Sequence, residues 1–176
     1  EEPTRPGDIP ALKSVRNHTS LPIATGERLY GANEFREVWT SQSVDIIQPD
    51  ITQTGGILEA KKISSTAESY SIMVAPHNVG GAISTSAAVT LVSTLRNGKI
   101  VEHFNDFADP HVKKVADNYP EVIDGYFELS EKPGWGIEIN EDFIKDNPPE
   151  KYKNITLDPG LNMFENPNWA QRGQSR

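Results

Sequence analysis

Short apolar segments alternate with amphipathic segments along the first part of the chain, and this alternation constrains the fold more than any other feature. The apolar segments are 22–25, 45–48, 71–75 and 99–102. The amphipathic segments, with apolar residues at helical spacing, are 8–19, 32–41, 55–70 and 80–95, and Asp8 is the expected N-cap of the first. Strands without polar alternation are typical of sheets covered on both faces. The sequence therefore predicts an α/β fold of parallel βαβ units.

The pattern changes after residue 105. Residues 107–125 are mixed and polar, and two short strands, 126–129 and 137–139, are predicted on either side of a turn at Pro133-Gly134-Trp135-Gly136. The last 30 residues are rich in Asn, Pro and Lys, which indicates an irregular tail along the surface or a disordered one.

Polar residues recur at the C-terminal ends of the predicted strands. They are Glu1, Glu27, Asp50, His77 and Glu102, at intervals of 26, 23, 27 and 25 residues. One βα unit of an eight-unit barrel takes roughly 25 to 30 residues, since such barrels have about 250. The intervals therefore place these side chains at one level, which in a (β/α) barrel is the catalytic face.

This set of residues favours chemistry at a hard cation. Converging carboxylates need a counter-charge, and oxygen ligands suit Mg²⁺. Asp50 can accept a hydrogen bond from one ring nitrogen of His77, which raises the basicity of the other and makes His77 a candidate general base. Removing a proton next to a carboxylate creates a second negative charge, which a cation would stabilise.

Five motifs carry a family resemblance. They are Glu1-Glu2-Pro3, Gly26-Glu27-Arg28, Gln48-Pro49-Asp50, Gly55-Gly56-Ile57 and Pro76-His77-Asn78. In this order and spacing they resemble the mandelate racemase subgroup of the enolase superfamily, and within it the galactonate and gluconate dehydratases. The resemblance implies that residues 1–104 are the second half of a (β/α)7β TIM-like barrel, from the end of strand 4 to strand 8. It also implies that residues 105–176 return to a capping domain.

The resemblance assigns roles residue by residue. Glu1 and Glu27 would be Mg²⁺ ligands, and Asp50 and His77 would form the dyad with His77 as base. Glu102 would bond the substrate carboxylate, with Arg28 and Asn78 as further substrate-binding candidates. The family's third metal ligand, its general acid and its capping domain lie upstream of Glu1, so we expect the chain alone to be inactive.

Composition narrows the functional classes. The net charge of −8 argues against a nucleic-acid surface, and the absence of cysteine excludes disulfides and thiolate metal sites. No apolar run approaches the roughly 20 residues that cross a bilayer, and no signal peptide is evident. We expect a cytoplasmic, homo-oligomeric enzyme acting on a small sugar acid. The start at Glu-Glu-Pro, without Met, suggests a chain that begins mid-protein and lacks the first half of its barrel.

Simpler interpretations remain open at this point. Asp50 is also a plausible helix N-cap, and His77 a plausible loop histidine. Glu27 is a plausible surface ion-pair partner of Arg28, and Glu1 a terminal residue that binds nothing. For function, the alternatives to dehydration are racemisation or epimerisation of a 2-hydroxy acid, or a homologue that binds without catalysis.

Overall fold

The computed structural model describes residues 1–104 and 110–148. The tail predicted for the last 30 residues lies outside these ranges, except for residues 147 and 148. The chain separates into two compact units, Glu1–Asn140 and Glu141–Arg176. The boundary predicted after residue 104 marks the end of the strand and helix alternation, and it stays a prediction.

A parallel sheet organises the first unit. Its strands are β1 (Ala24–Thr25), β2 (Ile46–Ile47) and β3 (Met73–Val74), in the order β1-β2-β3. On one side, the Glu2 amide donates to the Ala24 carbonyl over 3.0 Å, so the first residues extend alongside β1. The three strands confirm the predicted parallel arrangement.

Residues 99–102, where a strand was predicted, form no strand in the structure. Only Gly98 forms a bridge, which is parallel and pairs with Val74, although the Lys99 amide donates to the Val74 carbonyl over 2.8 Å. The Glu102 amide then reaches the Pro76 carbonyl at 3.3 Å. The predicted strand was wrong, because the apolar character of Ile100 and Val101 does not report whether the backbone pairs.

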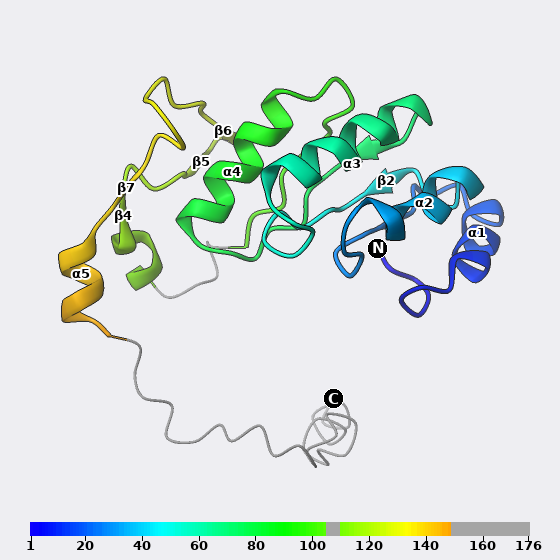
Figure 1. The fold of residues 1–176 in the computed structure, drawn as a ribbon, viewed down its shortest axis with the longest axis horizontal. Helices are drawn as coiled ribbons and strands as arrows, with labels where there is room; N and C mark the ends of the chain where they lie inside the picture. Colours follow the sequence, from blue (N-terminus) through cyan, green and yellow to red (C-terminus); the bar gives the residue numbers. More distant parts are fainter. Residues whose placement is uncertain (105–109, 149–176) are drawn as a thin grey trace, which may run out of the picture. The chain divides into compact units, whose positions relative to one another are not determined.

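Four helices alternate with the three strands along the chain, as predicted. They are α1 (Ile9–Asn17), α2 (Ala32–Ser41), α3 (Ile57–Ser69) and α4 (Ala82–Ser93), which run from blue to green in Figure 1. Asp8 caps α1 as expected, since its carboxylate accepts from the Ala11 amide at 3.1 Å. Each consecutive pair of helices is in contact, so the helices form a continuous layer.

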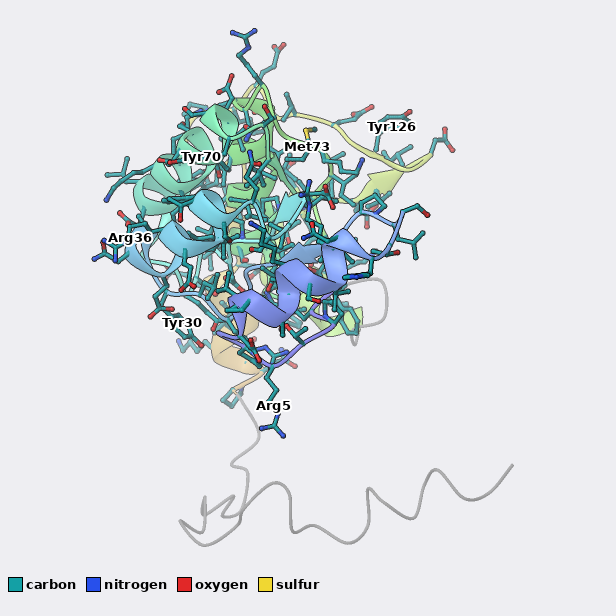
Figure 2. All side chains as sticks on the ribbon, turned by 90° about the vertical axis from the view of Figure 1, so that its right-hand side faces the viewer. Arg5, Tyr30, Arg36, Tyr70, Met73 and Tyr126 are labelled. Carbon is teal, nitrogen blue, oxygen red and sulfur yellow. The ribbon has the colours of Figure 1, made fainter. Side chains whose placement is uncertain are left out.

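The main core lies between α1, α2, α3 and the sheet. Phe35, Val38 and Trp39 share one face of α2 and are buried, and they pack with Ile47 and Val74 from the strands. Arg36 takes the opposite face and projects outward from the helix (Figure 2). A second core cluster joins α3 to α4 through Ala60, Ala87, Ala88, Leu91 and Ile51. The core therefore supports the strand ends that carry the polar residues.

Beyond residue 110 the first unit contains short antiparallel ladders. A 3₁₀ helix, η2 (Pro110–Val115), leads into β4 (Ala116–Asp117), which pairs with β7 (Glu138–Ile139). β5 (Val122–Ile123) pairs with β6 (Tyr126–Phe127). The two predicted strands are confirmed as the shorter β6 and β7, with the predicted turn between them, where the Gly136 amide donates to the Pro133 carbonyl at 3.3 Å. They pair with β5 and β4, not with each other. The Asp124-Gly125 turn between β5 and β6, with φ of 51° and 82°, is the hairpin signal that decides the pairing.

In the second unit the structure describes one helix, α5 (Glu141–Asp146). Across both described ranges, no helix combines the length and the apolar character that crossing a membrane would need.

A half-buried carboxylate joins α1 to the sheet. Asp45 Oδ1 accepts from Arg16 Nε at 3.1 Å and from Nη2 at 2.9 Å, and Asp45 Oδ2 accepts from the Ile23 amide at 2.9 Å. Burial by itself raises the pKa of Asp45, but the Arg16 and Ile23 hydrogen bonds outweigh it and lower the pKa below the ordinary 3.8. The ion pair is about one-third exposed on each side, so solvent screens it.

We expect Asp45→Asn to lower the free energy of unfolding by about 1 kcal/mol near neutral pH. A carboxylate with a depressed pKa stabilises the fold above its unfolded pKa and loses that contribution as pH falls through the folded pKa. The difference between wild type and variant should therefore shrink below about pH 4. Urea titrations at several pH values measure it, and a difference that grows on acidification would contradict this account.

Candidate active site

The predicted site residues follow successive parallel strands. Glu27 comes two residues after β1, Asp50 three after β2, and His77 three after β3. Because the C-terminal ends of parallel strands meet at one edge of a sheet, the three side chains start from a common level. Gly26 permits this at β1: its φ is +141°, and a Cβ there would lie 2.8 Å from the Gln48 amide nitrogen.

His77 bridges two of the carboxylates. Its Nδ1 lies 2.7 Å from Asp50 Oδ2, and its Nε2 lies 3.4 Å from Glu27 Oε2. Asp50 is 4% exposed, and the imidazole is mostly buried. An ionised Asp50 can only accept, so Nδ1 donates and the neutral ring keeps its lone pair on Nε2. The structure thus brings Glu27, Asp50 and His77 together.

The charges around the imidazole favour its protonated form. Burial alone lowers the pKa of His77, but the hydrogen bond to Asp50 and the negative charges of Glu102 and Glu27 outweigh it and raise the pKa above 6.5. Burial likewise raises the pKa of Asp50, and hydrogen bonds from Thr52, His77 and Gln53 reverse this, so that the pKa falls below 3.8. Asp50 therefore remains an acceptor for His77, whose basicity is increased.

Glu102 is the least satisfied carboxylate of the site. Its Oε2 is buried and has no hydrogen-bond partner among residues 1–104 and 110–148. Burial, together with the charges of Glu1 and Glu27, raises its pKa above 4.5 despite the nearby His77. The neighbouring His103 packs edge-on against Phe127, with ring centroids 5.0 Å apart. Of these two adjacent residues, Glu102 is the one that interacts with the other carboxylates.

The first two residues make different contacts. Glu1 Oε1 accepts from Gln48 Nε2 at 3.0 Å, and the residue is otherwise exposed. Glu2 accepts from the Thr25 hydroxyl at 3.3 Å and forms an ion pair with Arg28. Arg28 also lies 3.6 Å from Glu27, through Nε and Oε1. The guanidinium of Arg28, predicted to bind substrate, is thus engaged by two acidic residues, and its substrate role stays a prediction.

Asn78, the other substrate-binding candidate, is 1% exposed and internally bonded. Its amide nitrogen donates to Thr85 Oγ1 at 3.0 Å and to the Glu102 carbonyl at 3.2 Å, and its amide oxygen accepts from the Ser84 hydroxyl at 2.6 Å. These bonds tie the turn after β3 to α4 and to the Glu102 backbone. In this structure Asn78 positions Glu102, and direct substrate contact stays a prediction.

The donor set agrees in chemistry with a hard divalent cation. Glu1 and Glu27 supply carboxylate oxygens, and both raise the pKa of Glu102, so negative charge gathers there. Within the described ranges, no group of three His, Asp or Glu side chains is arranged to hold a metal ion. Two carboxylates would leave a cation in need of further oxygen ligands.

The family described as Enolase C-terminal domain-like matches residues 1–143. This chain belongs to that family. The match includes all the residues of the site described above. It also covers the parallel sheet and its four helices, so the mixed α/β fold is the one that this enolase-like family implies.

Relatives of this enolase-like chain include sugar-acid dehydratases. It is 37% identical over 145 residues to a D-gluconate/D-galactonate dehydratase of Picrophilus torridus, covering 82% of this chain and 37% of the relative. It is 32% identical over 158 residues to a D-galactonate dehydratase of Xanthomonas oryzae, covering 85% and 41%. The chain therefore spans about two fifths of the length of these relatives, and the resemblance to dehydratases of the mandelate racemase type is confirmed.

A solved structure gives the same result for the fold of this enolase-like chain. The mandelate racemase/muconate lactonizing enzyme of Jannaschia sp. CCS1 superposes with a TM-score of 0.76 at 34% identity. The superposition covers 82% of this chain and 36% of the Jannaschia protein.

Sequence reasoning missed Gln48 and Thr52, which hold Glu1 and Asp50 respectively. The signal for Gln48 was its place directly before Pro49-Asp50 at a strand end. Thr52 carried a comparable signal, since an Asp side chain often bonds to the backbone amide two residues on, as Asp50 does here.

Proposed function

We propose that the full-length protein is a Mg²⁺-dependent dehydratase of a sugar acid, such as gluconate or galactonate. Here the full-length protein means this chain together with any sequence joined to it in nature. The observation that carries the proposal is the position of His77, whose ring nitrogens lie 2.7 Å from Asp50 and 3.4 Å from Glu27. The names of the two relatives above support the reaction class.

In this proposal His77 is the general base. Asp50 accepts a hydrogen bond from Nδ1–H, so the Nε2 lone pair is free to take the proton from the substrate carbon next to the carboxylate. A pKa above the ordinary value makes the imidazole a stronger acceptor for that proton. Proton transfer by a positioned group contributes about 10²–10⁴-fold, so the developing negative charge needs further stabilisation.

Two sets of carboxylates would handle that charge. Glu102 has a raised pKa and a buried, unpartnered Oε2 among the described residues, so it can hold a proton and donate it to the substrate carboxylate. Glu1 and Glu27 would hold Mg²⁺. When bound, that ion supplies positive charge against the enediolate, worth about several kcal/mol.

The rest of the reaction follows from the enediolate. The hydroxyl on the next carbon leaves as water and takes its proton from an acid that family resemblance puts outside this chain. The resulting enol converts to a 2-keto-3-deoxy acid. The proton removed from the first carbon stays on His77 until solvent exchanges it.

A panel of aldonic acids tests the proposal. The full-length protein with Mg²⁺ should convert at least one aldonate to a 2-keto-3-deoxy acid, detected by a colorimetric assay and by mass spectrometry. Running the panel in deuterated water distinguishes the alternatives. Deuterium at the α-carbon without dehydration would favour a racemase or epimerase, and no reaction or exchange on any member would contradict the dehydratase assignment.

Mg²⁺ should also raise the melting temperature of the full-length protein. A ligand at about 100 times its Kd stabilises the folded state by about 2.7 kcal/mol. Glu27→Gln should lose most of this Mg²⁺-dependent shift, because it removes a charged oxygen ligand. Glu37→Gln, on the exposed face of α2, is the matched control and should keep the shift. An equal Mg²⁺-dependent shift of the melting temperature in both variants would contradict the role of Glu27 as a Mg²⁺ ligand.

We also propose that the parallel sheet belongs to a (β/α)7β TIM-like barrel, and that residues 105–176 return to a capping domain. The parallel order β1-β2-β3, the bridge to Gly98 and the greater length of the relatives support this.

We expect the full-length protein to be a homo-oligomer. Light scattering of the full-length protein measures its mass in solution and tests this.

A further inference from the structure

The two carboxylate oxygens of Asp50 have separate sets of partners. Oδ1 accepts from the Thr52 amide at 2.7 Å and from the Thr52 hydroxyl at 2.6 Å. Oδ2 accepts from His77 Nδ1 at 2.7 Å and, at a longer 3.3 Å, from Gln53 Nε2. One residue therefore supplies both bonds to the oxygen that does not face the imidazole.

This division matters because the terminal torsion of an aspartate is intrinsically loose. Rotation about χ2 has broad, roughly two-fold minima, so the side-chain torsion alone does not hold Oδ2 toward His77. Two bonds to Oδ1, from a donor on the backbone and a donor on the side chain, restrict that rotation. With Oδ1 occupied, Oδ2 is the oxygen left for the imidazole.

The Thr52 side chain contributes a hydrogen bond to Asp50 and no core packing. Thr52 is exposed, in contrast to the buried Ile51 and Thr54 on either side of the turn. The turn has its own backbone bonds, since the Gln53 and Thr54 amides donate to the Asp50 carbonyl at 3.1 and 2.8 Å. Loss of the Thr52 hydroxyl would therefore leave the turn and the core largely in place.

We propose that Thr52 is a positioning residue that holds the Asp50 carboxylate in the orientation in which Oδ2 pairs with His77. Thr52 itself touches neither substrate nor reacting atoms. This inference rests on the proposed role of His77 as base. It predicts that the hydroxyl of Thr52 affects catalysis only through the His77–Asp50 hydrogen bond.

The test compares two variants. Thr52→Val keeps the hydrogen bond from the backbone amide to Asp50 and loses the one from the hydroxyl, whereas Thr52→Ser keeps both. In the full-length protein, Thr52→Val should lower kcat about 10-fold with KM nearly unchanged, a part of the roughly 10²–10⁴-fold that positioned proton transfer contributes. Thr52→Ser should restore kcat to within about 2-fold of wild type, because the same oxygen is present. Thr54→Val is the matched control: it removes a neighbouring hydroxyl that bonds Gly31, not Asp50.

A second measurement does not depend on turnover. The proton shared by His77 Nδ1 and Asp50 should give a far-downfield proton NMR signal, which His77→Asn assigns by abolishing it. This proton should exchange with solvent about 10-fold faster in Thr52→Val than in wild type, Thr52→Ser or Thr54→Val. The reason is that the hydrogen bond between His77 and a more mobile Asp50 breaks more often.

Two outcomes would overturn the inference. One is an unchanged exchange rate and kcat in Thr52→Val, and the other is an equal loss in the Val and Ser variants. An absence of aldonate turnover by the wild type would instead count against the proposed function, while the NMR comparison would still test Thr52.

Discussion

Replacing His77 with asparagine in the full-length protein should lower kcat for the aldonate by about 10²–10⁴-fold, the contribution of a positioned general base. Asparagine can retain a polar contact with Asp50 but offers no basic nitrogen. The loss should appear equally in product formation and in deuterium exchange at the α-carbon, because both require the same proton to leave. Steady-state kinetics and mass spectrometry of the recovered substrate measure the two rates.

His18 supplies the matched control for this experiment. It lies at the C-terminal end of α1, with Nδ1 2.7 Å from the Ser14 carbonyl, outside the candidate site. His18→Gln should keep kcat within about 2-fold of wild type, since surface changes are usually mild. If His77→Asn kept the wild-type exchange rate, another group would have to be the base.

Replacing Phe35 with alanine should destabilise the fold by about 3–5 kcal/mol, the usual cost of removing a buried aromatic ring. Phe35 is fully buried in the main core, and its ring lies 6.0 Å from that of Trp39. The same ring supports the site, since a Cβ at Gly26 would lie 3.0 Å from a Phe35 ring carbon. Loss of the ring should therefore also loosen the turn that carries Glu27.

Urea titrations measure the change in the free energy of unfolding. Leu58, which is 83% exposed, is the matched apolar control, and Leu58→Ala should change stability by less than about 0.5 kcal/mol. A Phe35→Ala loss no larger than the Leu58→Ala loss would show that the α2 face does not hold the sheet as described. A normal Mg²⁺ shift in Phe35→Ala would argue against the link between this ring and Glu27.

The helices were predictable because local signals agree with one another. α2 carries Phe35, Val38 and Trp39 at helical spacing, and α1 has an aspartate at its N-cap. Both signals act within a few residues, so tertiary contacts did not need to be known. The parallel order of β1 to β3 then followed from the alternation of strands and helices.

Strand lengths and pairings beyond residue 98 were not predictable in the same way. Residues 99–102 are apolar enough for a strand, yet Gly98 alone forms a bridge. β7 pairs with β4, although the partners Ala116 and Ile139 lie 139 − 116 = 23 residues apart in the chain.

 Such a pairing depends on contacts between distant parts of the chain, which residue preferences do not report.

The site was predictable only as far as its strand ends. Glu27, Asp50 and His77 could be grouped because regular intervals put them at one level of a repeating fold. The residues that orient Glu1 and Asp50 were not found, because Gln48 and Thr52 act through individual hydrogen bonds. Asn78 was expected at the substrate, whereas its amide is bonded to Ser84, Thr85 and the Glu102 backbone.

The most direct measurement of the central claim is a crystal structure of the full-length protein with Mg²⁺ and a bound aldonate that cannot react. We predict that His77 Nε2 lies about 3–3.5 Å from the α-carbon of the aldonate, the distance of a near-attack arrangement, with Nδ1 still paired to Asp50. An aldonate bound away from His77, or an imidazole turned from Asp50 toward solvent, would contradict the account.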